Sequence, residues 1–543
     1  MIDVRPKPEL CKKYYAAGQW RDETIGDLVA RSVAAAPRKL ALKNADGSGI
    51  TYAELDELSS RLAQYLRANG FGEGDVLTMH LPNWWQSGVV MLATYKLGGV
   101  VHAAPPTYGW KDLAYTMAKC KSKAIVAAGR FRSADYTRNL LNVGDLQGLP
   151  PICLLLGEGA ETIGVQFDLA LAEEPIAAPV RVSPDSPAAV VFSSGTESKP
   201  KGVIHTHNTM LFGERMFGER LGLTPDDVCF MATPLSHMTG FVHGLVLNLT
   251  RACTLSLQDI FEGKRAVEIM QQDGATWTMG STPFLNDTIN ALAELAIPLP
   301  RFRFFACGGA PLPEAIVRLA SKVDVRVLPV YGSTESPPHT LTRPEAPLAD
   351  SWETDGEALP GIEMRVVDAD GRDVAFGVPG EELSRGPNTF IGYLDEPELT
   401  ARAIDADNWY HSGDIATMRA DNTIKIVGRI KDIIIRGGQN ISAREVEDLL
   451  IEHEAIKDVA IVGRPHARLG ETAVAVVTTK GDRPLQLDEL TRFLVARGVG
   501  SYKLPEALVI WPELPRTPSG KIQKYLIRQK LVESNAVDPD KSN

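Results

Sequence analysis

A polar loop follows directly after an apolar run near the middle of the chain. The run is AAVV at 188–191, and the loop is FSSGTESKPKG at 192–202. Glycines let the backbone N–H groups of such a loop turn toward an anion, and hydroxyl and ammonium groups add donors. The loop has neither the G-x-x-x-x-G-K-[ST] pattern of a Walker A loop nor the G-x-S-x-G pattern of a nucleophile elbow. It therefore predicts a phosphate-holding loop of another kind, with an ordinary surface loop as the alternative.

Four further stretches carry side chains suited to nucleotide chemistry. They are YGSTES at 331–336, YHSGDIA at 410–416, GRIKDIIIRGGQNISAREVE at 428–447 and PRTPSGKIQK at 515–524. Together with the loop, their order resembles that of the adenylate-forming superfamily, which includes acyl-CoA synthetases, adenylation domains of peptide synthetases and luciferases. The resemblance extends from about Leu28 to Lys524. Within the superfamily the chain looks most like AMP-dependent acid–CoA ligases, such as those for medium-chain acids or cyclohexanecarboxylate.

The resemblance implies a two-step reaction. A carboxylate is a poor acyl donor because its leaving group would be oxide, and transfer of AMP from ATP makes a mixed anhydride with a good leaving group. That transfer needs Mg²⁺, charge neutralisation at the phosphates and in-line placement of the carboxylate at the α-phosphorus. CoA then takes the acyl group, and AMP and pyrophosphate are released. Groups that bind and orient dominate such chemistry.

The resemblance also gives each matching residue a role. Lys521 would bridge the substrate carboxylate and the α-phosphate, Thr334 would donate to the α-phosphate, and Glu335 would be the Mg²⁺ ligand. Asp414, which we place in a tight turn, would accept the ribose hydroxyls, and Arg429 would donate to the ribose region. The other nucleotide contacts would come from the phosphate loop, the strand along adenine and the start of YGSTES: Ser193, Ser194, Gly195, Thr196, Lys201, Gly309, Ala310, Pro311, Tyr331, Gly332 and Ser333.

The thiol step implies a mobile C-terminal domain. In the superfamily this domain swings on a hinge, which here corresponds to Lys431. The swing would remove Lys521 and bring in RGGQNIS, where Gly437 and Gly438 would line a channel for pantetheine. We therefore expect an N-terminal domain at 1–430, holding the nucleotide and acyl sites, and a C-terminal domain at 431–543.

The acyl pocket is expected to be apolar. His237 in PLSHMTG resembles the superfamily's gate beside this pocket, with a structural histidine as the alternative. The resemblance places in the lining His237, Met238, Phe241, Thr278, Met279, Ala306, Cys307, Gly309 and His339. A buried charge on the substrate would lack a partner there and would cost several kcal/mol. A neutral short- or medium-chain, alicyclic or aromatic monocarboxylate fits, and the sequence does not choose among them.

Two local features depart from expectation. The phosphate loop reads GTES where the superfamily commonly has GTTG, so Glu197 brings a negative charge beside the phosphates. His205 and His207, in VIHTH, fall on one face of a predicted strand and could suggest a metal site. No third ligand is evident, so we interpret both histidines as structural.

The rest of the chain indicates an α/β protein. Helix-like segments such as 51–70 alternate with strand-like ones such as DVLTMHLP and SKAIVAAG, so we expect two α/β subdomains with mainly parallel sheets. Short strands at 361–428 predict a small antiparallel sheet or β-barrel, and the segment after 431 predicts a compact α+β unit. The net charge of −11 disfavours nucleic-acid binding.

Features that the sequence lacks bear on the location of the protein. Six scattered cysteines, no signal-like N-terminus and no long apolar run favour a cytoplasmic protein without a membrane span. A homodimer is allowed but not indicated.

Three alternatives to a CoA ligase stay open: an enzyme that loads a separate carrier protein, a non-catalytic nucleotide- or acyl-binding relative, and a luciferase-like oxygenase. The combination of Glu335, Asp414, Arg429 and Lys521 argues against a non-catalytic protein.

Overall fold

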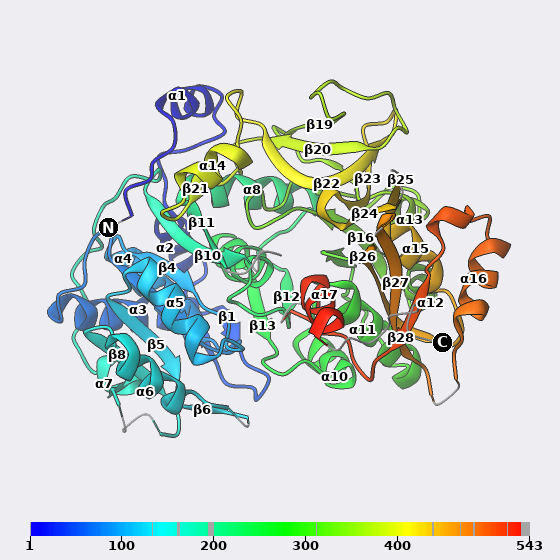
Figure 1. The fold of residues 1–543 in the computed structure, drawn as a ribbon. Helices are drawn as coiled ribbons and strands as arrows, with labels where there is room; N and C mark the ends of the chain where they lie inside the picture. The colour runs from blue at the N-terminus through cyan, green and yellow to red at the C-terminus, as the bar shows by residue number, and fades with distance from the viewer. Residues whose placement is uncertain are drawn as a thin grey trace.

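The structure is a computed structural model that describes residues 2–132, 134–159, 163–193, 200–310, 312–436, 439–466, 468–481, 484–517 and 520–533. In Figure 1 the first part of the chain, blue to cyan, lies on the left, and most C-terminal strands and helices lie on the right, beside β16, α12 and α13. In the described residues no helix is both long and apolar enough to cross a bilayer.

Two large sheets make up most of the N-terminal part. One has the strand order β18 (Glu357–Ala358), β17 (Thr340–Leu341), β16 (Arg326–Tyr331), β15 (Phe304–Gly308), β14 (Trp277–Gly280), β12 (Val228–Met231), β13 (Thr254–Leu257), β1 (Leu40–Lys43), β2 (Gly49–Thr51). The other has the order β21 (Gly392–Tyr393), β11 (Lys201–Thr206), β10 (Pro187–Ser193), β4 (Val100–Ala103), β3 (Val76–His80), β5 (Ala124–Ala128), β8 (Ile152–Leu156), β9 (Val165–Gln166). Their central strands are parallel, which confirms the expected architecture.

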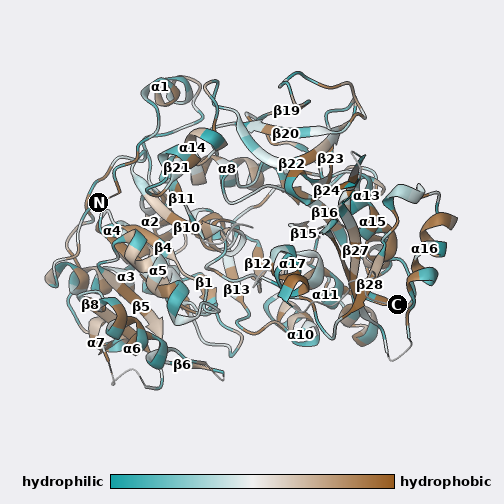
Figure 2. Ribbon diagram, in the orientation of Figure 1, coloured by the Kyte–Doolittle hydropathy of each residue, from teal (hydrophilic) through white to brown (hydrophobic). Residues whose placement is uncertain are grey.

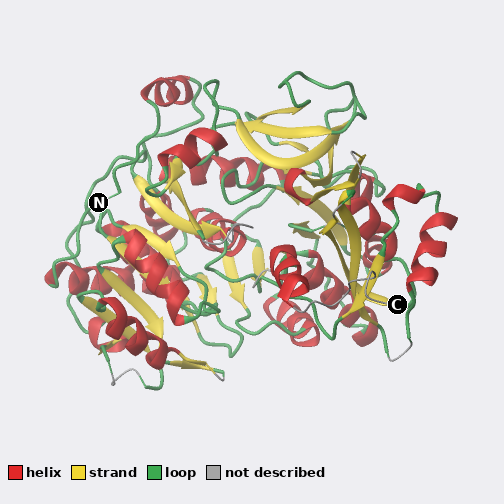
Figure 3. Cartoon of the chain, viewed as in Figure 1, coloured by secondary structure: helices red, strands yellow, loops and turns green. Residues whose placement is uncertain are grey.

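Helices flank both large sheets (Figure 3). In the N-terminal part they are α1 (Pro8–Ala16), α2 (Ile25–Ala35), α3 (Tyr52–Ala68), α4 (Gln86–Lys96), α5 (Trp110–Cys120), α6 (Tyr136–Gln147), α7 (Phe167–Ala170), α8 (His207–Arg220), α9 (Leu247–Thr250), α10 (Gly263–Asp273), α11 (Thr282–Leu295), α12 (Glu314–Lys322), α13 (Asp350–Glu353) and α14 (Pro397–Ala403). A π-helical segment, η2 (Thr239–Val246), precedes α9.

The predicted helix at 51–70 shows why the sequence folds this way. Thr51 and Glu54 form a capping box at the start of α3, which satisfies backbone N–H groups that have no partner within the helix. Leu55, Leu62 and Leu66 are buried along one face. That face joins a single apolar cluster that includes residues of both large sheets, so burial of the stripe fixes the helix against the core.

The third sheet differs from one expectation. It is antiparallel, with the order β19 (Glu363–Val367), β20 (Gly380–Arg385), β22 (Tyr410–Met418), β23 (Ile424–Arg429). Within the described residues its edge strands β19 and β23 do not pair, so it is an open, curved sheet and not a closed barrel (Figure 3). Four strands are too few to close a barrel around packed side chains.

The C-terminal part is a separate α+β unit. Its sheet has β25 (Gln439–Ser442), β24 (Ile433–Arg436), β27 (Gly470–Thr479) and β26 (Ile456–His466) in that order, and β28 (Ala507–Ile510) pairs with β27. The helices are α15 (Ala443–Leu450), α16 (Leu487–Ala496) and α17 (Lys524–Glu533). Hydrophilic and hydrophobic residues alternate along α16 in Figure 2, as expected for a helix with one buried face. The unit has its own apolar cluster, and a short 3₁₀ turn, η3 (Ile430–Asp432), connects it to β23.

Candidate active site

Asp414 and Arg429 form an ion pair on neighbouring strands. They are directly opposite each other in the β22–β23 register, and Arg429 Nε lies 2.6 Å from Asp414 Oδ1. Tyr331, at the end of β16, donates its hydroxyl to Asp414 Oδ2 at 2.8 Å. Asp414 lies within β22, after Gly413 in the left-handed region, so the predicted tight turn is wrong. Because a carboxylate offers about four acceptor positions, Asp414 can still accept ribose hydroxyls.

The electrostatics of this pair favour its charged form. Asp414 raises the pKa of Arg429, and this effect outweighs the opposing effect of burial. Burial raises the pKa of the Tyr331 hydroxyl well above its ordinary value, and the nearby carboxylates of Asp414 and Glu382 raise it further. Tyr331 is therefore a neutral donor, and Asp414 is held by one charged and one neutral donor.

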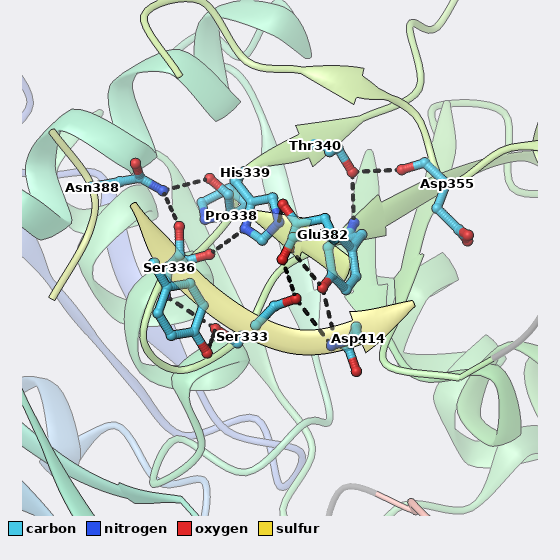
Figure 4. Close-up of polar contacts among 12 residues, drawn as sticks. Ser333, Ser336, Pro338, His339, Thr340, Asp355, Glu382, Asn388 and Asp414 are labelled. Atoms are coloured by element: carbon cyan, nitrogen blue, oxygen red, sulfur yellow. Dashed lines mark hydrogen bonds and ion pairs between the residues drawn. The ribbon is translucent and has the colours of Figure 1, made fainter. Parts of the chain in front are cut away.

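A buried polar network lies behind the YGSTES loop (Figure 4). His339 donates through Nδ1 to the Ser336 carbonyl at 2.9 Å, and its Nε2 lies 3.5 Å from Glu382 Oε1. A carbonyl oxygen can only accept, so Nδ1 carries a proton. Asn388 donates to Ser336 Oγ at 3.1 Å and to the Pro338 carbonyl at 3.2 Å. Burial lowers the pKa of His339, but Glu382, the Ser336 carbonyl and Asp414 together raise it by more, and the net shift is upward. These contacts fix the loop that carries Thr334 and Glu335.

Glu335 is held from the edge of the second large sheet. Its side chain accepts the Tyr393 hydroxyl at Oε1, at 2.9 Å, and its carbonyl accepts the Phe390 N–H at 2.7 Å. Lys201 Nζ lies 5.7 Å from the centre of the Tyr393 ring. Among the described residues Oε2 of Glu335 has no hydrogen-bond partner, so this oxygen fits a hard cation such as Mg²⁺.

Lys521 reaches the same region from the C-terminal part. A Cβ built on Gly309 would lie 2.8 Å from Lys521 Cε, so the lysine stem passes directly over this glycine. Burial lowers the pKa of Lys521, and Arg429 lowers it further, while Asp414 and Glu335 act in the opposite direction. Lys521 is therefore close enough to Asp414 and Glu335 for both carboxylates to act on its pKa.

Two cavities meet at Lys521. The larger, about 330 Å³, contains Tyr331, Asp414 and Arg429, and the smaller, about 80 Å³, contains His237, Met238 and Met279. Both are lined by Gly309, Val330, Gly332 and Lys521. The larger cavity has the groups expected around a nucleotide, and the smaller lies where the acid is expected.

The smaller cavity corrects part of the predicted acyl lining. Four of the predicted residues line it: His237, Met238, Met279 and Gly309. Phe241, Thr278, Ala306, Cys307 and His339 do not; Cys307 borders the larger cavity, and His339 faces Glu382. The sequence analysis missed His243, which lines this cavity and pairs through Nδ1 with buried Glu214 at 2.8 Å. The π-helical turn of η2, which has no simple sequence signature, brings His243 to this wall.

His237 lies beside the lysine. It is partly buried, and its Nδ1 accepts the backbone N–H of Thr239 at 3.2 Å. Burial lowers the pKa of His237 to about 3, and the nearby Lys521 contributes to this shift. The ring is therefore neutral at ordinary pH, which suits a wall of the acyl pocket and not a charged group.

The described residues cover part of the predicted phosphate site. Ser193 and Lys201 are opposite each other in the β10–β11 register, so they flank the loop. Gly309 has φ +86°, Ala310 accepts a hydrogen bond from Thr282, and Ser333 donates to Tyr410 at 3.3 Å. Seven predicted residues lie outside the described residues. They are Ser194, Gly195, Thr196 and Glu197 of the phosphate loop, Pro311 of the predicted adenine strand, and Gly437 and Gly438 of the predicted pantetheine channel.

His205 and His207 do not share a strand face. His205 lies near the end of β11, whereas His207 is the first residue of α8, because Thr206 caps that helix. Each is buried and hydrogen-bonded, and in the described part of the chain no cluster of three or more His, Cys, Asp or Glu side chains could hold a metal. Protein contacts hold each ring, and the structural interpretation of both histidines stays a prediction.

Comparison with known proteins identifies the family. A profile described as "AMP-binding enzyme" matches residues 29–394, and one described as "AMP-binding enzyme C-terminal domain" matches residues 445–521. The chain belongs to the AMP-binding enzyme family. Within this AMP-binding enzyme, both matches contain predicted site residues: Thr334 lies in the first and Lys521 is the last residue of the second.

Individual relatives agree with the family assignment. The AMP-binding enzyme is 39% identical over 525 residues to a medium-chain fatty-acid–CoA ligase of Escherichia coli K12. The aligned residues cover 96% of this chain and 92% of that protein. It is 30% identical over 542 residues to the human mitochondrial medium-chain acyl-CoA ligase ACSF2, with 94% and 88% covered. Among solved structures, ATP-bound MatB from Rhodopseudomonas palustris matches with a TM-score of 0.83 and 26% identity, over 94% of this chain and 99% of that one.

Proposed function

We propose that this chain is an AMP-forming acid–CoA ligase that activates an apolar monocarboxylate. The observation that carries the proposal is the position of Lys521, which borders both the ribose-side cavity and the acyl-side cavity. A cation at the junction of a nucleotide site and an acid site is what transfer of AMP to a carboxylate requires. The names of the relatives, medium-chain acid–CoA ligases among them, support the same reaction.

In the first step the chain's own groups bind and orient the substrates. Asp414 accepts ribose hydroxyls and Arg429 donates nearby, while the Thr334 hydroxyl meets the α-phosphate. Lys521 places its ammonium group between the acid and the α-phosphate, where negative charge accumulates in the transition state. Glu335 would hold Mg²⁺, which would supply charge neutralisation at the leaving pyrophosphate.

In the second step CoA must approach the carbonyl that Lys521 now shields. We infer that residues 431–543 rotate as a unit about the η3 turn at Ile430–Asp432, which takes the lysine away. A short turn between two sheets is a suitable hinge, because few backbone angles need to change. Gly437 and Gly438 would then line the pantetheine channel. A cytoplasmic location and a homodimer remain expectations from the sequence.

The acyl-side lining supports an apolar substrate. Apart from Lys521, the described residues that border the smaller cavity include no lysine, arginine, aspartate or glutamate. A second carboxylate or an amino group on the substrate would therefore lose hydration without gaining an ion pair. Since one methylene contributes only about 1–3 kcal/mol in such a pocket, several related acids should react.

The proposal is tested by a screen for CoA-dependent AMP release with linear C2–C12 acids, cyclohexanecarboxylate and benzoate. We expect activity with a group of neutral monocarboxylates and little with succinate or an amino acid. Absence of AMP release with every acid would contradict the proposal. Transfer to a phosphopantetheinyl carrier protein but not to CoA would indicate the carrier-loading alternative instead.

A further inference from the structure

We propose that His205 is a positioning residue for adenylate formation, because it fixes the main chain of Thr334 where that residue must meet the α-phosphate. The inference rests on the proposed function. It concerns a side chain that was interpreted from the sequence as structural, and that does not itself border either cavity.

The contacts of His205 link two sheets. The residue lies on β11, in the second large sheet, and its Nε2 is 2.8 Å from the carbonyl oxygen of Thr334, which follows β16 of the first large sheet. Its Nδ1 is 3.0 Å from the hydroxyl oxygen of Thr209, in the first turn of α8. With both ring nitrogens engaged and no exposed surface, the ring cannot rotate without breaking a buried hydrogen bond.

The protonation state follows from the same contacts. Burial lowers the pKa of His205 to about 4, so the ring is neutral at ordinary pH. A carbonyl can only accept, so the proton is on Nε2, which donates to Thr334, and Nδ1 accepts from the Thr209 hydroxyl. Thr209 also accepts the backbone N–H of Thr206 at 3.0 Å. The Thr334 carbonyl therefore fixes the tautomer, and Thr209 joins the other ring nitrogen to the cap of α8.

The position of β11 explains why this link matters for catalysis. The strand begins at Lys201, directly after the phosphate loop, and it pairs with β21, whose Tyr393 holds Glu335. Thr334 and Glu335 are thus held from one sheet edge, through His205 and Tyr393 on adjacent strands. This sheet edge follows the phosphate loop in the chain and also fixes Thr334 and Glu335. It therefore keeps the Thr334 hydroxyl, which donates to the α-phosphate, aligned with the triphosphate. Catalytic groups lose much of their effect when displaced by about 0.5 Å.

The test compares His205→Leu, which removes the hydrogen bond, with His205→Gln, whose amide N–H can still donate. His207→Leu is the matched control, since His207 is also buried and neutral but bonds the Ile25 N–H at 3.4 Å, away from the site. We expect His205→Leu to slow acid-dependent ATP–pyrophosphate exchange by about 10-fold. The KM for the acid should stay within about twofold, His205→Gln should recover most of the rate, and His207→Leu should not show the loss.

A double-mutant cycle separates positioning from stability. If His205 acts through Thr334, His205→Leu should cost about 10-fold in the wild-type background but less than about twofold in Thr334→Ala. Three results would overturn the inference while the wild-type chain still makes acyl-CoA. They are rate losses of the two single variants that simply add in the double variant, an equal loss of rate in His207→Leu, and no loss of rate in His205→Leu. Absence of exchange in the wild type with every acid would instead overturn the proposed function and, with it, this inference.

Discussion

Lys521 passes directly over Gly309, a residue more than two hundred positions earlier in the chain. The glycine has φ +86°, and a Cβ at this position would lie 2.8 Å from Lys521 Cε and 3.3 Å from Nζ. The two residues belong to different parts of the fold, the turn after β15 and the segment before α17. Their contact therefore brings the C-terminal part into the arrangement in which the lysine can serve adenylate formation.

Replacing Gly309 with alanine should displace the lysine. We expect Gly309→Ala to reduce adenylate formation by at least about 30-fold, equivalent to about 2 kcal/mol, because the ammonium group must move from the junction of the cavities. Gly371→Ala is the matched control: it has φ +77° and no atom within 4 Å of a Cβ, so it carries the backbone strain without the contact. Equal activity in the two variants, measured by pyrophosphate exchange, would contradict the role of this contact.

Loss of the Asp414 charge should weaken nucleotide binding. Asp414→Asn leaves Arg429 without its carboxylate and weakens acceptance from the ribose hydroxyls, so the KM for ATP should rise about 30-fold, or about 2 kcal/mol. Asp373→Asn is the control, since Asp373 forms an ion pair with Arg365 of β19 at 2.6 Å and neither residue lines either cavity. A similar KM for ATP in both variants would refute the ribose assignment.

Four buried histidines should make the fold sensitive to acid. Burial lowers the pKa of His80, His205 and His207 to about 4 and that of His102 to about 3, from an ordinary value of 6.5. The unfolded chain takes up these protons below pH 6.5 and the folded chain does not. The contribution of these neutral histidines to the free energy of unfolding is therefore fully present above pH 6.5. It is lost as the pH falls toward 4, at about 1.4 kcal/mol per histidine per pH unit.

This pH effect is measured by urea unfolding between pH 7.5 and 5.0. Because carboxylates also titrate at the lower end of the range, the informative quantity is the difference between the wild type and His207→Gln. The variant should lose stability less steeply, by about 1.4 kcal/mol per pH unit below pH 6. Parallel curves for the two proteins would show that His207 does not resist protonation in the folded state.

How much of this site the sequence could predict depends on whether a residue acts through a motif or through packing. Thr334, Glu335, Asp414, Arg429 and Lys521 stand in ordered motifs. The structure brings all of them except Glu335 to the walls of one pair of cavities, and Glu335 lies close enough to raise the pKa of Lys521. The α/β class and α3 followed equally directly from periodicity and capping residues.

Other features could not be read from spacing. The sequence left open whether the third sheet is an antiparallel sheet or a barrel, since a run of short strands does not show whether the edge strands meet. His339 turns toward Glu382 and not the acyl pocket, and His205 reaches Thr334 across two sheets, because both orientations depend on tertiary neighbours. The pairing of His243 with Glu214 depends on a π-helical turn that the sequence does not signal.

A substitution on the CoA side should have a step-specific effect. We expect Gly438→Leu to leave pyrophosphate exchange within about twofold and to slow thioester formation by at least about 100-fold, because a side chain would narrow the proposed pantetheine channel. The measurement is acyl-CoA formation from a supplied acyl-adenylate. Normal thioester formation by this variant would contradict the channel assignment.

The central claim is that one cleft performs both steps and that Lys521 serves only the first. The most direct measurement compares Lys521→Ala with wild type and with Lys503→Ala, a C-terminal lysine that pairs with Glu445 at 2.6 Å, in the two half-reactions separately. The account predicts that Lys521→Ala loses acid-dependent pyrophosphate exchange by at least about 1,000-fold and converts a supplied acyl-adenylate to acyl-CoA at close to the wild-type rate, while Lys503→Ala retains both. Equal loss of both half-reactions in Lys521→Ala, or full retention of exchange, would contradict it.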